Sequence, residues 1–269
     1  MTNRSFKLTP GLVSVTFRPI PAKEVIRLAS LAEIKGIEWG SDIHLKPGDF
    51  ETADLIRTES IKNGIEVFSY ASYYHAGTSQ PEEFDQVLET AEKLASPRIR
   101  VWAGKSEAKD ISTKQYHQVI DDLLRISDLA KKRGIEIGIE YHGGTLTGTV
   151  DSTLALFKSL GDENIFSYWQ PSQRTSVETN LRAIEQLGPL IRMVHCFHWD
   201  YTATEIIRRP LTEGWEDWQL YLKALQQFTS AEIISIEFIQ NDDPDLFMND
   251  SKTLRLWIEN SHLLSLVAS

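Results

Sequence analysis

Three residues that can do acid/base or metal chemistry interrupt apolar runs of the sequence. Glu140, His195 and Glu237 stand at the ends of the fifth, seventh and eighth of eight such runs. A buried carboxylate is costly without a partner, so two glutamates that meet in one place need positive charge between them. A divalent metal ion would satisfy both, because glutamate oxygens and an imidazole nitrogen are usual ligands of Mn, Mg, Co and Zn. The alternatives are ion pairs of the glutamates with Arg or Lys, and for His195 a histidine satisfied within the core.

Residues near the ends of other runs have the side chains that a sugar or polyol site needs. Indole faces pack against the C–H faces of sugars and leave the hydroxyls to polar neighbours. Arginine can hold an oxyanion or a phosphate, and loop His and Lys often line binding sites. Each candidate also has an ordinary alternative, because aromatic side chains fill cores and loop charges are solvated. The substrate-binding candidates are Trp102, Trp169, His142, His198, His44, Lys105 and Arg208, with Trp199, Arg209, Tyr74 and His75 in similar positions.

The elements that must position these residues are short apolar runs that alternate with amphipathic stretches. Such runs are typical of buried strands, and the stripe from Val119 to Leu129 has helical spacing. Strict alternation of strands and helices predicts a parallel sheet. The predicted strands are LVSVTF from Leu12, GIEWG from Gly36, IEVFSY from Ile65, RIRVWAG from Arg98, IEIGIEYH from Ile135, IFSYWQ from Ile165, RMVHCFHW from Arg192 and IISIEFI from Ile233.

A repeated phrase marks three of the junctions between a helix and the next strand. It reads KGIE, NGIE and RGIE, with glycines at Gly36, Gly64 and Gly134. A glycine just past a helix can take the left-handed position, and the isoleucine that follows begins a strand. The glycines are 28 and 70 residues apart, which corresponds to one and then two βα units of about 35 residues.

The chain length agrees with one domain built from eight such units. At 269 residues the chain has the size that an α/β barrel commonly occupies as a single domain. The sequence has no phosphate-type glycine fingerprint, which favours a closed barrel over a doubly wound sheet. It also has no linker or composition shift that would mark a second domain. We therefore predict a single (β/α)₈ barrel over residues 1–269, with its chemistry at the C-terminal ends of the strands.

The combination of Glu140, His195 and Glu237 on strands five, seven and eight resembles the metal site of xylose isomerase-like barrels, the sugar isomerase and epimerase superfamily that includes the ketose 3-epimerases. The resemblance spans the chain from LVSVTF to IISIEFI. It implies a divalent metal ion held by both glutamates, the histidine and a residue of strand six, which here is Gln170. It also implies that the two glutamates work as the acid/base pair.

Two departures place the chain in a divergent branch. In YWQPSQ, Gln170 and Gln173 stand where relatives have an aspartate and a histidine. An amide oxygen brings no negative charge, so metal affinity should fall or shift to other ions, and Gln173 can only hydrogen-bond a substrate. His198 stands where relatives often have an aspartate in strand seven, and Asp200 follows it.

Composition excludes several classes of partner. The formal net charge of −10 repels nucleic acid and anionic membrane surfaces, and no stretch is apolar enough to cross a membrane. Cys196 is the only cysteine and the N-terminus lacks a signal peptide pattern, so the expected compartment is the cytoplasm. The expected partner is a small-molecule sugar or polyol, and a homo-oligomer is left open.

The leading hypothesis is a metal-dependent isomerase or epimerase acting on a sugar, a sugar phosphate or a polyol. Proton abstraction next to a carbonyl needs a base on each face or one moving proton, while the metal stabilises the enediolate. A dehydratase or lyase needs the same groups, and a non-catalytic sugar-binding barrel also agrees with the two glutamines. Phosphodiester hydrolysis, as in the AP endonuclease branch of this fold, is disfavoured by the acidic balance and by a total of 7 His.

Overall fold

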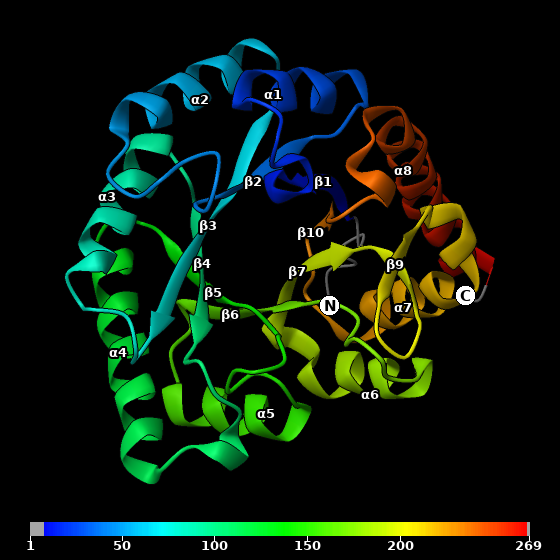
Figure 1. Cartoon of the computed structure of the whole chain (residues 1–269). Helices are drawn as coiled ribbons and strands as arrows, with labels where there is room; N and C mark the ends of the chain where they lie inside the picture. Colours follow the sequence, from blue (N-terminus) through cyan, green and yellow to red (C-terminus); the bar gives the residue numbers. More distant parts are fainter. Residues whose placement is uncertain (1–7, 268–269) are drawn as a thin grey trace.

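The computed structural model describes residues 8–267, and within them eight parallel strands close into a barrel (Figure 1). Their order around the barrel is β1-β10-β7-β6-β5-β4-β3-β2. Each barrel strand therefore lies beside the barrel strands that precede and follow it in the chain, and β1 pairs with β10 to close the barrel. The remaining strands, β8 and β9, form a separate two-stranded sheet. The helices form a ring outside the strands (Figure 1). The predicted (β/α)₈ barrel is therefore confirmed. The first seven residues of the N-terminus lie outside the described part of the chain.

The predicted apolar runs each overlap a barrel strand. The strands are β1 (Thr9–Val13), β2 (Gly36–Gly40), β3 (Glu66–Ala76), β4 (Arg98–Ala103), β5 (Glu136–Ile139), β6 (Ile165–Trp169), β7 (Ile191–Cys196) and β10 (Ile233–Ile236).

The first predicted strand is wrong over most of its length. Only its first two residues belong to β1, and Ser14–Phe17 form the 3₁₀ helix η1. The hydroxyl of Ser14 accepts a hydrogen bond from the Gly40 amide at 2.9 Å, and that of Thr16 accepts one from the Phe238 amide at 3.1 Å. These side chains bond backbone that a continuing strand would not reach, so the chain turns across the end of the barrel instead.

Local sequence explains where several helices begin. Ser112 and Gln115 form a reciprocal capping box at the start of α4. The side chains of Thr149 and Ser176 cap α5 and α6. The predicted stripe places Val119, Leu123 and Ile126 in the core. The helices are α1 (Ala22–Leu31), α2 (Phe50–Lys62), α3 (Glu83–Leu94), α4 (Thr113–Lys131), α5 (Val150–Leu160), α6 (Val177–Leu187), α7 (Trp215–Phe228) and α8 (Pro244–Val267).

The three glycines of the repeated phrase do not share one role. Gly64 and Gly134 have φ of +67° and +69°, as predicted for a left-handed residue after a helix. The prediction for Gly36 is wrong, because it is the first residue of β2, and the left-handed residue after α1 is Glu33 at φ +57°. A Cβ at position 36 would lie 2.4 Å from the Phe68 ring, so glycine is required there for space.

Two features were not predicted from the sequence. The residues after β7 form an antiparallel hairpin of β8 (His198–Tyr201) and β9 (Ile206–Arg209), which pairs His198 with Arg209. A small cluster of buried side chains, separate from the main core, fills the barrel interior and consists of Phe68, Phe166, Tyr168, Met193 and Ile233. No helix within residues 8–267 has the length and apolar character needed to cross a membrane.

Candidate active site

Alternation along the barrel strands selects the side chains that face the interior above the apolar cluster. Residues two apart in a strand point to the same face. On β7, His195 lies two positions after Met193 of the apolar cluster, so both side chains face the interior. On the neighbouring strand, Ser235 pairs with His195, and Glu237 lies two positions after Ser235. The predicted residues are thereby brought together: His195 Nδ1 lies 3.4 Å from Glu237 Oε2.

Two residues that the sequence analysis missed complete this arrangement. Arg100 of β4 places its Nη1 atom 3.0 Å from Glu140 Oε2 and 3.4 Å from Glu38 Oε1. Glu38 of β2 also lies 3.3 Å from His195 Nε2. The side chains of Glu38, Arg100 and His195 are at most 4% exposed. We call the five residues the charge chain, which runs Glu140, Arg100, Glu38, His195, Glu237 with carboxylates and cations alternating.

The charges of the chain hold one another in the ionised state. Burial favours the neutral form of Glu38, but Arg100 and His195 outweigh it and lower the Glu38 pKa to about 2. The pKa of Glu140 is also lowered: burial acts to raise it, but the charges of Arg100, His195 and His142 and the Trp102 hydrogen bond together outweigh burial. Burial acts to lower the pKa of His195, but the carboxylates of Glu237 and Glu38 raise it to about 10. At neutral pH the imidazole is therefore a cation with a proton on each nitrogen.

The two catalytic candidates have different partners. Glu140 accepts hydrogen bonds from the Trp102 indole and, at 3.2 Å, from the Gln170 amide, in addition to its contact with Arg100. Glu237 meets His195 through Oε2, and among the described residues its Oε1 has no hydrogen-bond donor. Because donors stabilise the ionised form, Glu140 is the more constrained carboxylate and Glu237 the freer one.

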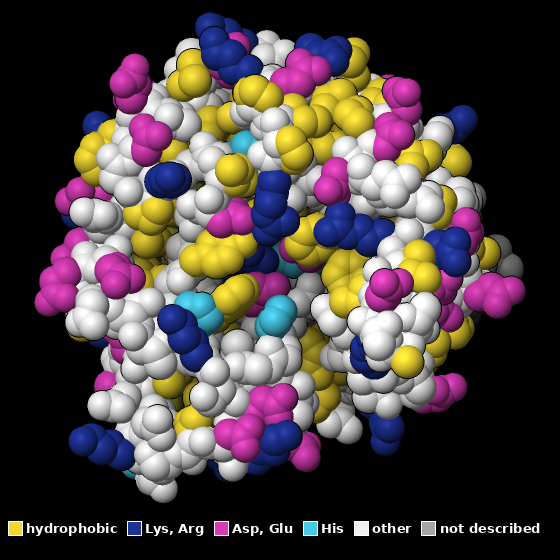
Figure 2. Space-filling model, viewed as in Figure 1, with side chains coloured by type: hydrophobic (Ala, Val, Ile, Leu, Met, Phe, Trp, Pro, Cys, Tyr) yellow, Lys and Arg dark blue, Asp and Glu magenta, His cyan; other side chains and the backbone are white. Residues whose placement is uncertain are grey.

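Aromatic side chains form a wall over Glu140. Trp102 is stacked on His142 with ring centres 5.4 Å apart and meets the ring of His75 at 4.4 Å and that of Tyr73 at 5.5 Å. Hydrophobic, acidic, basic and histidine side chains gather around the centre of this end of the barrel (Figure 2). The wall offers a flat apolar surface beside a carboxylate, which suits the C–H face of a sugar.

A cavity of about 500 Å³ adjoins the site between the segments that follow β5 and β6. His142, Gln170 and Gln173 line it, together with Tyr141 and Phe197. This volume lies in the range of small-molecule sites. The predicted substrate-binding roles of His142, Gln173 and Trp102 stay predictions; Trp102 contacts Glu140, His142 stacks on Trp102, and Gln173 lines the cavity.

Two other candidates, His44 and Trp169, are buried and have partners within the fold. His44 is buried, and both ring nitrogens have partners at 3.0 Å, the Ser14 hydroxyl and the Ile20 carbonyl. Trp169 is fully buried and packs against Trp218 and Tyr221 of α7, outside the barrel. These positions agree with the alternative that aromatic and histidine side chains at strand ends belong to the core, and the predicted substrate-binding roles of His44 and Trp169 stay predictions.

Three further candidates lie on the periphery. Arg208 of β9 pairs with Asp242 at 2.5 Å and lies over the Phe238 ring, while His198 packs against Gly214. Lys105 lines a separate cavity of about 120 Å³ beside α4. Their substrate-binding roles stay predictions.

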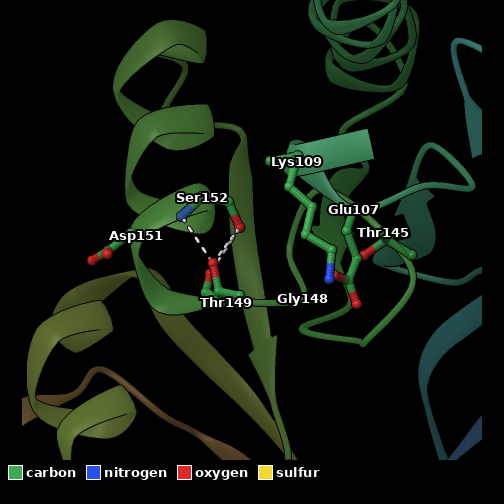
Figure 3. A pocket seen from close by; sticks show the side chains of 8 residues that line it. Glu107, Lys109, Thr145, Gly148, Thr149, Asp151 and Ser152 are labelled. Atoms are coloured by element: carbon green, nitrogen blue, oxygen red, sulfur yellow. Dashed lines mark hydrogen bonds and ion pairs between the residues drawn. The ribbon is translucent and has the colours of Figure 1, made fainter. Parts of the chain in front are cut away.

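Another cavity, of about 430 Å³, is lined by none of the charge-chain residues. It lies between Lys109 and Glu107 on one side and the N-terminus of α5, with Thr149 and Ser152, on the other (Figure 3). Lys109 pairs with Glu107 at 2.8 Å, and Thr149 caps the helix by binding the Ser152 amide. These groups are occupied with one another, and none of the predicted site residues lines this cavity.

The predicted ligands do not fit a divalent ion as their side chains are arranged. His195 Nδ1 and Glu237 Oε2 have the separation of two ligands of one ion, but the other two predicted ligands do not join them. The Gln170 amide NH₂ donates to Glu140 and to the Tyr141 carbonyl, so its oxygen is directed away from both, and Arg100 contacts Glu140. Among the side chains that the structure describes, residues 8–261, no three His, Cys, Asp or Glu are grouped so that they could hold an ion.

The closed barrel of eight parallel strands places the chain in the class of (β/α)₈ barrels, and comparison with known proteins gives the family. The xylose isomerase-like TIM barrel family matches residues 26–257. The chain belongs to this family, which confirms the resemblance found in the sequence.

Individual relatives are distant. A 3-dehydroshikimate dehydratase from Bacillus anthracis is 24% identical over 58% of this chain and 59% of its own length. A probable L-ribulose-5-phosphate 3-epimerase from Mycoplasma pneumoniae is 23% identical over 60% of this chain and 52% of its own. The chain thus spans between half and three fifths of the curated relatives that it matches.

Solved structures share the fold over more of the chain. A probable 3-DHS dehydratase from Bacillus anthracis has a TM-score of 0.78 at 19% identity and covers 92% of this chain and 99% of its own. A xylose isomerase-like barrel protein from Mycobacterium smegmatis, solved in complex with magnesium, has a TM-score of 0.70 at 12% identity, with 96% and 98% covered. Some structures of this fold therefore contain a divalent metal.

Proposed function

We propose that this protein is an enzyme that moves a proton at a carbon next to a carbonyl group of a sugar or polyol, as an isomerase or epimerase. The observation that carries the proposal is the pair of carboxylates, Glu140 and Glu237, at the C-terminal ends of β5 and β10, each beside a buried cation. Chemistry in βα barrels takes place at this end of the strands. The adjoining 500 Å³ cavity and the wall around Trp102 give the substrate a place to bind.

The different surroundings of the two carboxylates suggest different roles. Glu237, with Oε1 free of donors, is the base that takes the proton from carbon. Glu140 is held ionised by its donors and has no proton to give, so in an isomerisation Glu237 returns the proton that it took to the neighbouring carbon. Glu140 takes the proton of the substrate hydroxyl and passes it to the former carbonyl oxygen, while Arg100 and His195 offset the negative charge that develops on the substrate oxygen. Because the predicted ligands do not fit an ion as arranged, no step of this scheme depends on a metal.

Dehydration is the second candidate, favoured by the dehydratase found among both the sequence relatives and the solved structures. It begins with the same proton abstraction and then expels a hydroxyl group from the neighbouring carbon. The two reactions differ in product: isomerisation conserves mass, whereas dehydration releases water and creates a conjugated carbonyl that absorbs ultraviolet light.

The first prediction is that Glu237→Gln abolishes proton exchange. The amide keeps the shape of the side chain but cannot accept a proton, and general bases contribute about 10²–10⁴-fold to rate. Substrate C–H exchange in D₂O, followed by NMR over ketoses, aldoses, their phosphates and cyclic hydroxyketones, measures the effect.

Glu185→Gln, on the exposed surface of α6, is the matched control and should exchange at the wild-type rate. Near-normal exchange in a folded Glu237→Gln variant would rule out the assignment of the base. Saturable binding by the wild type without exchange of any substrate would instead indicate a non-catalytic sugar-binding barrel.

A further inference from the structure

The charge chain balances most of its own charge without an external ion. Three carboxylates, on Glu38, Glu140 and Glu237, face two cations, Arg100 and His195, at 3.0 to 3.4 Å. The sequence argument for a metal was that two buried glutamates would otherwise lack positive charge. We propose that Arg100 occupies the place of a divalent metal in this barrel, and that the protein works without one.

Arg100 is a permanent and fixed cation. A guanidinium group does not lose its proton in proteins. Its backbone is held inside the sheet between Ala71 and Gly138, and its carbonyl accepts a hydrogen bond from the Ser72 hydroxyl at 2.7 Å. The guanidinium lies against Glu140, the first of the predicted ligands, so an ion bound there would have to displace it.

Glu38 keeps both cations in place. It lies between Arg100 and His195, and its second oxygen accepts a hydrogen bond from the Ser69 hydroxyl at 2.6 Å. The side chain is fully buried, so its only compensation comes from these neighbours. Glu38 lies 3.3 Å from Nε2 of His195 and Glu237 lies 3.4 Å from Nδ1, so each ring nitrogen faces a carboxylate of the charge chain.

Gln170 agrees with the same interpretation. Its NH₂ group contacts two acceptors, Glu140 Oε1 and the Tyr141 carbonyl, both at 3.2 Å. An aspartate at this position would add a fourth carboxylate beside Glu140 and would need a further cation. The neutral donor at position 170 and the arginine at position 100 thus both contact Glu140, and together they stabilise its carboxylate without an ion.

Metal binding tests the proposal without any knowledge of the substrate, so it can fail separately from the proposed reaction. The full chain is purified without chelator, its metal content is measured by mass spectrometry, and Mn²⁺, Mg²⁺ and Zn²⁺ are titrated by calorimetry. We expect substoichiometric metal and no binding tighter than about 1 mM, the weak end of protein cation sites. One tightly held ion per chain, or micromolar binding at that stoichiometry, would overturn the proposal.

The variant Arg100→Met tests the role of Arg100 itself. Removal of the cation leaves Glu38 and Glu140 uncompensated, so this variant should gain binding of one Mn²⁺ per chain, at least tenfold tighter than the wild type. Arg182→Met, on the exposed face of α6, is the control and should show no gain. A folded Arg100→Met variant with unchanged affinity would contradict the assignment. If it does not fold, Arg100→Lys, which keeps a cation, decides: folding with no metal supports the proposal, and stoichiometric metal overturns it.

Discussion

At the scale of single residues, the environment of each carboxylate differs although both lie at strand ends. Glu140 accepts hydrogen bonds from Trp102 and Gln170 and forms an ion pair with Arg100, whereas Glu237 meets only His195. Donors lower the basicity of a carboxylate, so identical side chains in one site acquire different roles. Gln170 is one of the residues that make this difference, because its amide donates to Glu140 and not to Glu237.

Gln170→Asp is expected to bind Mn²⁺ at least about tenfold more tightly than the wild type. The substitution replaces an amide donor with a carboxylate beside Glu140, which adds negative charge and a charge-assisted contact for an ion. The shorter side chain and the loss of the hydrogen bond to Glu140 should also lower the melting temperature of the metal-free variant.

Calorimetric titration of both metal-free proteins measures the affinities. Gln173→Asp, which changes the neighbouring cavity residue in the same way, is the control. Equal affinities in folded proteins would show that position 170 is no part of an ion site, and Gln170 would then be a residue that recognises substrate hydroxyls.

At the scale of elements, the same local phrase serves two structural purposes. Gly64 and Gly134 end helices in the left-handed conformation, and a Cβ added at either would meet no atom within 4 Å. Gly36 lies in β2, where an added Cβ would lie 2.4 Å from Phe68. The first two positions need glycine for backbone conformation and the third needs it for space.

These differences predict unequal costs of substitution. Gly134→Ala should lower the free energy of unfolding by about 1 kcal/mol, the cost of a left-handed alanine. Gly36→Ala should cost more, about 1–3 kcal/mol or above, because the buried Phe68 ring must shift. Urea denaturation of the two variants measures both values, and equal costs would contradict the role assigned to Gly36.

At the scale of the whole molecule, barrel closure joins five strands through their charges. Three residues of the charge chain lie in strands: Glu38 in β2, Arg100 in β4 and His195 in β7. The other two, Glu140 and Glu237, directly follow β5 and β10. Breaking a buried pair of this kind typically costs about 3–5 kcal/mol, because the remaining charge is left without a partner. The charge chain therefore contributes to stability as well as to the site.

The stability of the protein should fall as the pH rises from neutral to about 10. The pKa of His195 is raised from 6.5 to about 10 in the folded state, so its proton stabilises the fold fully below pH 6.5, and this contribution is lost as the pH rises through the folded value. The slope due to one proton is at most about 1.4 kcal/mol per pH unit.

Urea denaturation between pH 6 and pH 10 measures this slope. His195→Gln should be less stable at neutral pH and show a flatter dependence, whereas His117→Gln, on the exposed face of α4, should follow the wild type. A wild-type slope that His195→Gln does not reduce would assign the titration to another group.

The sequence by itself determined the barrel, most of its strands and the positions of Glu140, His195 and Glu237 at strand ends, because apolar runs, helical stripes and glycine junctions are local patterns. Only the tertiary structure decided which charges meet. Arg100 and Glu38 come from β4 and β2, far in the chain from His195, and alternation tells which face a residue takes but not its partner across the barrel. The stagger of the closed sheet sets those partners, while packing against α7 holds Trp169 and hydrogen bonds to Ser14 and Ile20 hold His44.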